Sequence, residues 1–250
     1  MKLKNKKALV TGSASGIGRA IALAYAKEGA DLALNYFDRK EDAQQLKELI
    51  DKEYGVKTFL VEANISDESQ VQKMVDKTIE ELGSIDILVN AAGILTQVPM
   101  EKMDINVWDQ MININLRGTF LCTRFVLPHM IEKRNGRIIS IASQLAQIGG
   151  VELTHYCAAK AGIIGMTKSL AREVGEFGIT VNCIAPGTIE TDLIKGLDEN
   201  WKQQKQKELV ISRFGKPEEV APSAVFLASD PDGNLYTGQT LGPNMGDVML

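Results

Sequence analysis

The sequence has 250 residues, 44% of them hydrophobic and 24% charged, with a formal net charge of −4 at pH 7. These values are ordinary for a globular protein and leave room for one large α/β domain or two small ones. The negative charge gives no reason to expect nucleic acid, because phosphate binding needs a basic face. The basic cluster at residues 2–7 is short and is interpreted as a solvated chain end.

The sequence carries no signal for export or for a membrane. The apolar stretch at residues 8–10 ends at Thr11-Gly12, and no window approaches the ~20 apolar residues of a membrane span. Cys122, Cys157 and Cys183 lie far apart without a CxxC pair, so neither a disulfide framework nor a metal site is expected. We therefore expect a cytoplasmic protein.

Short β-branched runs alternate with longer helical patterns along the chain, which predicts βαβ units. Strands are expected at 7–11, 31–36, 58–61, 85–89, 137–141, 180–184 and 239–241, and helices at about 17–27, 40–53, 68–82, 104–129, 154–177 and 217–228. Right-handed crossovers then favour a doubly wound parallel sheet, the Rossmann fold, with strand order 3-2-1-4-5-6-7 and helices on both faces.

No linker or repeat interrupts the chain, so residues 1–250 are expected to form a single domain that carries both the cofactor and the substrate sites. After Pro186-Gly187 the pattern becomes polar and weakly periodic. Such segments often exclude water from a pocket by closing over it. The sequence therefore predicts a mobile lid at about residues 188–211.

A glycine-rich turn at residues 11–18, Thr-Gly-Ser-Ala-Ser-Gly-Ile-Gly, joins the first expected strand to the first expected helix. Glycines let the backbone approach a pyrophosphate, whose charge the helix N-terminus stabilises. Such a turn alone is weak evidence, but its place directly after the first strand favours a dinucleotide site. The candidate phosphate contacts are Gly12, Ser13, Ser15, Gly16, Ile17 and Gly18.

Tyr156 and Lys160 lie four residues apart, on one face of an expected helix. An ammonium close to a phenol favours the phenolate, so we expect the pKa of Tyr156 to fall from about 10 toward neutrality. Such a group can give a proton to a carbonyl oxygen or take one from an alcohol. Ser143 ends a strand and could bind the substrate oxygen. Asn115 is unfavourable inside a helix, which indicates a specific hydrogen-bonding task.

These motifs resemble those of the short-chain dehydrogenase/reductase family over nearly the whole chain, including members of the 3-oxoacyl-ACP reductase and glucose dehydrogenase type. The glycine spacing, the turn at residues 90–93, the set Asn115, Ser143, Tyr156 and Lys160, and Pro186-Gly187 follow in the family's order. The resemblance implies an enzyme that moves a hydride between NAD(P)(H) and a carbonyl or secondary alcohol.

By the same resemblance, Tyr156 is the general acid/base, Lys160 contacts the nicotinamide ribose, and Asn115 holds a water in a proton relay. It also implies a homotetramer. The further cofactor residues that it implies are Tyr36, Asp38, Arg39, Asn64, Ile65, Asn90, Ala91, Gly93, Tyr156, Lys160, Pro186, Gly187, Thr188 and Ile189.

The signals for the choice of cofactor conflict. An acidic residue usually ends the second strand of NAD enzymes, and Tyr36 stands there in this chain. Asp38 could still reach the ribose, whereas Arg39 and Lys40 could neutralise the 2′-phosphate of NADP. The balance favours NADP(H), with NAD(H) as the alternative.

Substrate specificity is expected in the loops at residues 94–100, 144–153 and 188–211, at the carboxyl edge of the sheet. The candidate substrate residues are Ser143, Gln144, His155 and Tyr156, with His155 interpreted as pocket wall. Because these loops are mixed in polarity, the first hypothesis is a polar sugar, polyol or hydroxy acid. A 3-oxoacyl thioester is the alternative.

Two rival functions come from other classes. A serine hydrolase built on Ser143 and His155 would lack the GxSxG elbow. A non-catalytic NAD(P)-sensing protein could share the fold, but the sequence retains both Tyr156 and Lys160. The unusual ending at residues 242–246 leaves the contacts of the C-terminal segment open.

Overall fold

The computed structural model describes residues 1–195 and 198–249. Within them, one parallel seven-stranded sheet has the order β3-β2-β1-β4-β5-β6-β7, which confirms the predicted topology. The strands are β1 (Lys7–Thr11), β2 (Asp31–Tyr36), β3 (Thr58–Glu62), β4 (Ile87–Asn90), β5 (Gly136–Ile141), β6 (Ile179–Ile184) and β7 (Thr240–Leu241).

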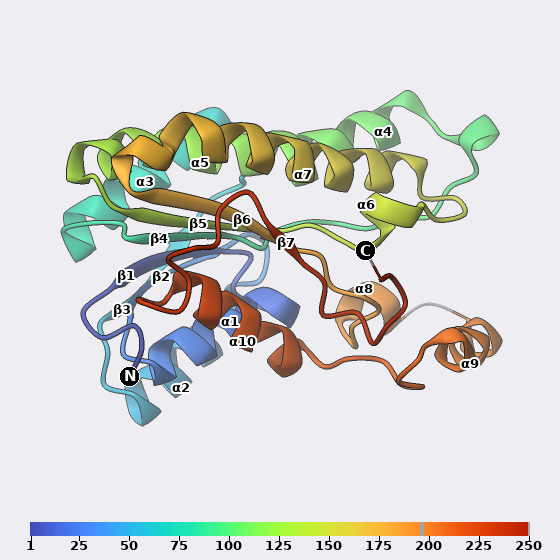
Figure 1. Ribbon diagram of the computed structural model, residues 1–250, viewed down its shortest axis with the longest axis horizontal. Helices are drawn as coiled ribbons and strands as arrows, with labels where there is room; N and C mark the ends of the chain where they lie inside the picture. Colours follow the sequence, from blue (N-terminus) through green and yellow to red (C-terminus); the bar gives the residue numbers. More distant parts are fainter. Residues whose placement is uncertain (196–197, 250) are drawn as a thin grey trace.

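Helices cover both faces of this sheet, as Figure 1 shows: α1, α2 and α10 lie on one face, and α3, α5 and α7 on the other. The α-helices of the described residues are α1 (Gly16–Lys27), α2 (Lys40–Glu53), α3 (Glu68–Leu82), α4 (Ile105–Ile112), α5 (Gly118–Lys133), α6 (Leu145–Ile148), α7 (Thr154–Val174), α8 (Asp192–Lys195), α9 (Glu199–Glu208) and α10 (Pro217–Ala228). Parallel strands covered on both faces read as continuous apolar runs. Accordingly, Ala8 and Val10 of β1 belong to one core cluster and Leu9 to the other.

The helix expected at about 104–129 is divided in the structure. α4 is followed by a π-helical turn, Asn113–Arg117, and then by α5. The π-helical turn contains Asn115, whose carbonyl accepts a hydrogen bond from the Thr119 hydroxyl at 2.8 Å. Apolar periodicity does not register one extra residue in a turn, and π-turns occur frequently at functional sites.

The expected lid segment contains two short polar helices, α8 and α9, that the sequence pattern did not predict. Asp198 begins α9 by accepting a hydrogen bond from the Trp201 N–H at 2.9 Å. The two ends of the segment are joined, because the Gly215 N–H donates to the Thr188 carbonyl at 3.0 Å and the Glu190 N–H to the Gly215 carbonyl at 2.9 Å. In Figure 1 this segment, α6 and the C-terminus lie at the same end of the sheet.

No α-helix in the described part of the chain is long and apolar enough to cross a membrane. The same residues contain no group of three or more histidine, cysteine or acidic side chains that could hold a metal ion.

Candidate active site

The glycine loop is shaped so that only glycine fits at two positions. A Cβ at Gly12, whose φ is +62°, would lie 2.6 Å from the Ala92 Cα, and one at Gly18 would lie 2.3 Å from the Gly12 carbonyl oxygen. Ser15 is the N-cap of α1, yet its side chain makes no capping hydrogen bond. Gly16 and Ile17 therefore begin α1 with N–H groups that have no side-chain acceptor among the described residues, as a pyrophosphate site requires.

Asn35, on β2, binds this loop through hydrogen bonds, and it was not among the residues predicted from the sequence. Its side chain is 1% exposed, and its Oδ1 accepts from the Gly12 N–H at 3.3 Å while its Nδ2 donates to the Ala63 carbonyl at 3.1 Å. Its carbonyl accepts from both the N–H and the hydroxyl of Ser13, each at 2.9 Å. The Ser13 hydroxyl is thus committed to the strand. An asparagine inside an apolar strand was the available signal.

The turn after β4 is fixed beside the glycine loop. The Thr11 hydroxyl accepts from the Ala91 N–H at 3.1 Å and the Ala92 N–H at 3.2 Å. Asn90 donates to the hydroxyls of Thr123 and Ser140, both at 3.2 Å, and its Oδ1 is buried without a partner among the described residues. The predicted residues of this turn therefore border the glycine loop.

Of the residues predicted for the adenosine end of the cofactor, Tyr36 and Arg39 already form hydrogen bonds with other side chains. The Tyr36 hydroxyl donates to Glu62 at 3.3 Å, and burial raises the pKa of Tyr36. Asp38 is exposed with a φ of +57°. The exposed Arg39 guanidinium donates to Asp192 of α8 at 2.8 Å. Arg39 is thus the predicted cofactor residue that contacts α8, in the segment at residues 188–211.

Asn64 and Ile65, which follow β3, have mainly structural contacts. Asn64 Oδ1 accepts from the N–H of Ser66 at 3.0 Å and from its hydroxyl at 2.8 Å. Ile65 is buried in the core, where a Cβ at Gly118 would lie 2.6 Å from its Cδ1. Asn64 Oδ1, the acceptor that this residue could offer to the predicted cofactor, is therefore already bonded to Ser66.

Tyr156 and Lys160 lie one turn apart near the start of α7. Lys160 is 5% exposed, its Nζ donates to the Ile141 carbonyl at 2.7 Å, and the same Nζ lies 5.7 Å from the centroid of the Tyr156 ring. Ser143, also buried, accepts from the Leu145 N–H at 3.1 Å through its hydroxyl. The carboxyl end of β5 thus places Ser143 and the Ile141 carbonyl, which accepts from Lys160, next to α7.

The expected shift of the Tyr156 pKa toward neutrality is wrong for the protein without a bound cofactor. Burial raises the pKa of Tyr156 to about 12, although hydrogen bonding to Ser143 acts in the opposite direction. Burial also lowers the pKa of Lys160 to about 8. The reason is that both groups lose solvent, and the ammonium donates to the Ile141 carbonyl.

Asn115 converges on the same place from the π-helical turn. Its side chain accepts from the Ile94 N–H and donates to the Ile94 carbonyl, both at 3.0 Å. A Cβ at Gly93 would lie 2.4 Å from Asn115 Oδ1 and 3.6 Å from Lys160 Nζ. Asn115 therefore holds the loop after β4 against the catalytic helix. Its role in holding a relay water stays a prediction.

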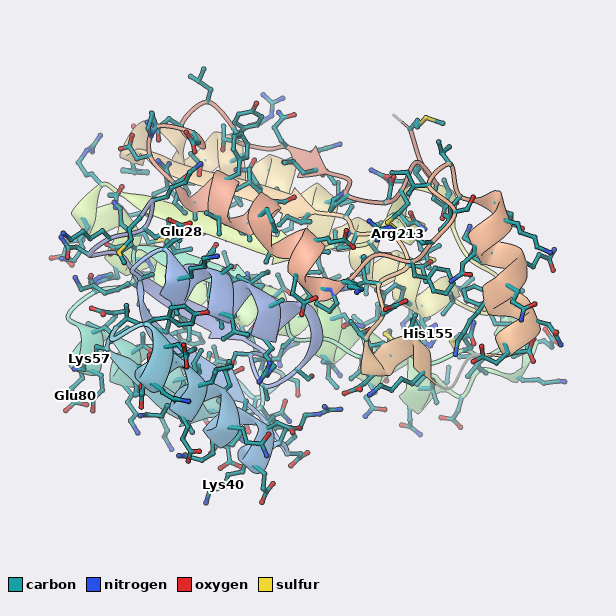
Figure 2. All side chains as sticks on the ribbon, turned by 90° about the horizontal axis from the view of Figure 1, so that it is seen from below. Glu28, Lys40, Lys57, Glu80, His155 and Arg213 are labelled. Carbon is teal, nitrogen blue, oxygen red and sulfur yellow. The ribbon has the colours of Figure 1, made fainter. Side chains whose placement is uncertain are left out.

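His155 and Gln144 are buried rather than open to the pocket. His155 is fully buried, its Nε2 lies 2.8 Å from the Thr96 hydroxyl, and burial lowers its pKa. Figure 2 shows His155 at the end of the molecule that also carries Arg213, opposite Lys57 and Glu80. Gln144 is 3% exposed, and its side-chain amide donates to Asp247.

The residues after β6 run beside the C-terminal segment. The Pro186 carbonyl accepts from the Gln144 N–H, and the Gly187 N–H donates to the Pro243 carbonyl, both at 3.1 Å. Thr188 bonds to Gly215 through its backbone, and Ile189 is buried in the core. Pro186 and Gly187, predicted for the nicotinamide side, thus lie between the loop that carries Gln144 and the segment that carries Pro243.

The glycine loop, the free start of α1 and the buried Lys160 fit a nicotinamide dinucleotide. Residues at the glycine loop would hold its pyrophosphate, and Lys160 and Tyr156 would face its nicotinamide end. When bound, this cofactor supplies or accepts a hydride. The neighbouring Ser143 and Tyr156 hydroxyls can hold and protonate a carbonyl oxygen. Fold and site together define a nicotinamide-dependent oxidoreductase of carbonyls and alcohols.

Comparison with known proteins agrees. Residues 12–246 match a family model described as enoyl-(acyl carrier protein) reductase. The chain is 41% identical over 244 residues to the 3-oxoacyl-[acyl-carrier-protein] reductase FabG of Staphylococcus aureus, with 98% of each chain covered. It is 42% identical over 243 residues to the (2S)-[(R)-hydroxy(phenyl)methyl]succinyl-CoA dehydrogenase subunit BbsD of Thauera aromatica, with 96% of each covered.

Among solved structures, a short-chain dehydrogenase from Burkholderia cenocepacia in complex with NADP superposes with a TM-score of 0.91, at 33% identity over 99% of each chain. The protein therefore belongs to the short-chain dehydrogenase/reductase family. It is an NAD(P)-dependent oxidoreductase, as the motifs in the sequence predict.

Proposed function

We propose that the protein interconverts a 3-oxoacyl thioester and its 3-hydroxyacyl counterpart with NADP(H), with Tyr156 as the proton donor and acceptor. The observation that carries this proposal is the group formed by the buried Ser143 and Lys160 and the half-buried Tyr156, where the end of β5 meets α7. The names of both similar enzymes contain an acyl carrier, acyl carrier protein in one and coenzyme A in the other.

The surroundings of the site favour an acyl thioester over the polar substrate that the sequence suggested first. Gln144 and His155, two of the polar residues behind that hypothesis, are buried and bonded to other side chains. The segment after β5 instead exposes Val151 (88%), and the segment after β6 exposes Val210 (70%). Apolar side chains on both segments suit an acyl chain, because burying them with it removes apolar surface from water.

The proposed reduction uses the protonation state that burial imposes. With its pKa raised to about 12, Tyr156 carries its proton at neutral pH and can donate it. Ser143 would donate a hydrogen bond to the carbonyl oxygen, and that oxygen would take the Tyr156 proton, while the bound dinucleotide would supply the hydride that the carbonyl carbon needs. Lys160 holds the site in place and supplies positive charge as the phenolate forms. In the oxidation direction each transfer runs backwards.

The preference for NADP(H) is supported by Arg39, whose guanidinium is exposed at the end of the adenosine side. A guanidinium binds a phosphate through two parallel hydrogen bonds. Arg39→Asp should therefore weaken NADPH binding more than NADH binding. Tighter binding of NADH than of NADPH by the unmodified protein would make NAD(H) the cofactor.

The proposed activity is tested by following NADPH consumption with an acetoacetyl thioester and with a free sugar ketone, and NADPH formation from NADP+ with a hydroxy acid. We expect turnover with the thioester, and a loss of about 10²- to 10⁴-fold in Tyr156→Phe, which removes only the proton donor. NADPH affinity, measured by fluorescence titration, should stay nearly unchanged in that variant. Turnover of the sugar ketone but not of the thioester would restore the polar-substrate hypothesis. Binding of NADPH with no turnover of any carbonyl would favour a sensing protein.

We further propose a cytoplasmic homotetramer. Family resemblance suggests that the long helices expected at about 104–129 (α4 and α5) and 154–177 (α7) pair across one two-fold axis and the C-terminal segments across another. Phe120 on α5 is 48% exposed, Ile105 on α4 is 74% exposed and Leu235 near the C-terminus is 95% exposed, which supports burial by partner subunits. Light scattering at micromolar protein should give four times the mass of one chain. A monomer mass would contradict the proposal.

A further inference from the structure

The C-terminal segment connects the loop after β5, which carries Ser143 and Gln144, to α9 through one buried carboxylate. The Asp247 side chain is only 8% exposed and accepts from the side-chain amide of Gln144 and from the Lys205 ammonium, the latter at 2.8 Å. Gln144 follows Ser143 directly, Lys205 lies on α9, and Asp247 is three residues from the end of the chain. Three distant parts of the sequence thus meet at Asp247.

The contact with Asp247 fixes the orientation of the Gln144 amide. A carboxylate only accepts hydrogen bonds, so the amide NH₂ of Gln144 must face Asp247. The Gln144 Oε1 is then left buried without a partner in the described part of the chain. The backbone is held as well, since the Gln144 N–H donates to the Pro186 carbonyl at 3.1 Å. Gln144 therefore has one defined position beside Ser143.

The contact with Lys205 is more enclosed than the other ion pairs of the lid. The Lys205 side chain is 18% exposed, whereas the Arg39 and Asp192 side chains are each 42% exposed. Although burial acts against the charge, the hydrogen bond to Asp247 raises the pKa of Lys205, so the ammonium persists. Partly buried pairs are screened by salt much less than exposed ones.

Backbone contacts reinforce this connection along the C-terminal segment. The Ile211 N–H donates to the Met245 carbonyl at 3.1 Å. A Cβ at Gly246 would lie 2.8 Å from the Val210 Cβ, so the segments that carry these two residues pass in close contact. The segment that carries Asp247 therefore follows the end of the lid, and Figure 1 shows the C-terminus at the same end of the sheet as α6 and α8.

We propose that Asp247 is a positioning residue, which orients the Gln144 amide beside Ser143 and fastens α9 to the catalytic loop. This inference rests on the proposed function in one respect: the positioned loop is the one that binds the carbonyl substrate. Fastening of α9 does not depend on which carbonyl is reduced.

Three variants separate the two contacts. Asp247→Ala removes both, whereas Asp247→Asn keeps an acceptor for Gln144 and removes the charge that faces Lys205. Lys205→Met removes the same ion pair from the other side. We expect Asp247→Ala to raise KM for the thioester about tenfold with kcat changed less than about threefold, because the loss affects substrate binding more than chemistry. NADPH affinity should change less than about twofold in all three.

Limited proteolysis without cofactor measures the fastening directly. Cleavage within residues 198–208 should become about fivefold faster in Asp247→Asn and in Lys205→Met, since opening of a segment exposes its backbone. The double variant should cleave no faster than either single one, because the two residues act through one contact. The matched control is Lys202→Met, which removes a lysine of α9 that is 17% exposed and whose contacts, with Glu199 and with the Lys195 carbonyl, both stay within residues 188–211.

Equal cleavage rates in the parent and in Asp247→Asn, or equal effects of Lys202→Met and Lys205→Met, would overturn the proposal. An unchanged KM in Asp247→Ala would overturn the positioning of Gln144. Failure of the parent to reduce any thioester would instead contradict the proposed function, while proteolysis would still decide whether Asp247 fastens α9.

Discussion

The glycine loop after β1 and the segment after β6 both close the carboxyl edge of the sheet, but they are held differently. The loop is held by buried groups: Asn35 bonds Gly12 and Ser13, and Thr11 bonds the neighbouring turn. The segment at residues 188–211 meets the adenosine side through the exposed pair of Arg39 and Asp192. The glycine loop is thus held by buried hydrogen bonds, whereas α8 of the second segment is joined to Arg39 by an exposed ion pair.

This difference indicates which region can move. An unsatisfied buried hydrogen-bonding group costs about 1–3 kcal/mol, so displacing the glycine loop from Asn35 is expensive. Exposed ion pairs contribute about 0–1 kcal/mol, since water and salt replace them readily. We therefore expect the loop proposed to bind the dinucleotide to be rigid, and the contact between α8 and Arg39 to open at a smaller cost.

The largest effect is expected from a methyl group placed in the rigid region. Gly18→Ala puts a Cβ 2.3 Å from the Gly12 carbonyl oxygen, whereas Gly165→Ala on α7 meets nothing within 4 Å. The first variant should lose roughly 1–3 kcal/mol of unfolding free energy and bind NADPH more weakly, because backbone must shift. The second should gain about 0.5–1 kcal/mol, as alanine favours a helix. Urea unfolding measures both. Equal stabilities would mean that the glycine loop is not rigid.

A second effect concerns the buried lysine of the rigid region. The pKa of Lys160 is lowered from 10.5 to about 8, so between these pH values the unfolded chain binds a proton that the folded protein has released. Unfolding free energy then rises with pH across this window, by up to roughly 3 kcal/mol for this group, and is insensitive to its titration below about pH 8.

Lys160→Met should abolish that rise. The measurement is urea unfolding of the parent and the variant from about pH 7 to about pH 9, below the ordinary pKa of 10.0 at which Tyr156 titrates in the unfolded chain. Because all other groups are shared, the difference between the two proteins isolates Lys160. A difference that does not depend on pH would show that the lysine is solvated rather than buried.

The smallest effect is expected at the surface contact of the lid. Asp192→Asn frees Arg39 and should tighten NADPH binding about twofold without changing NADH binding, since only the former carries a 2′-phosphate. The gain should shrink at high salt. Asp42→Asn is the control, because Asp42 lies 3.6 Å from the same guanidinium within α2. Tighter NADH binding in Asp192→Asn would show that the lid, and not Arg39, limits cofactor entry.

Local chemistry made much of the fold and site predictable. Strand runs such as residues 31–36, the helix at 40–53 and the order of the sheet follow from periodicity and right-handed crossovers, and the structure reproduces them. The glycine spacing and the interval between Tyr156 and Lys160 are also local, because a loop and one helical turn bring their residues together. These features placed the chain in its family before any contact was known.

Tertiary structure alone decided the contacts between distant segments. Asn35 beneath the glycine loop, Asp192 against Arg39, and Asp247 between Gln144 and Lys205 join residues at least 22 positions apart, and no local pattern encodes such pairs. It also decided the direction in which the pKa values of Tyr156 and Lys160 shift. Spacing shows that Tyr156 and Lys160 are neighbours, but burial, which depends on the whole fold, determines that the phenol keeps its proton and the ammonium holds its own less firmly.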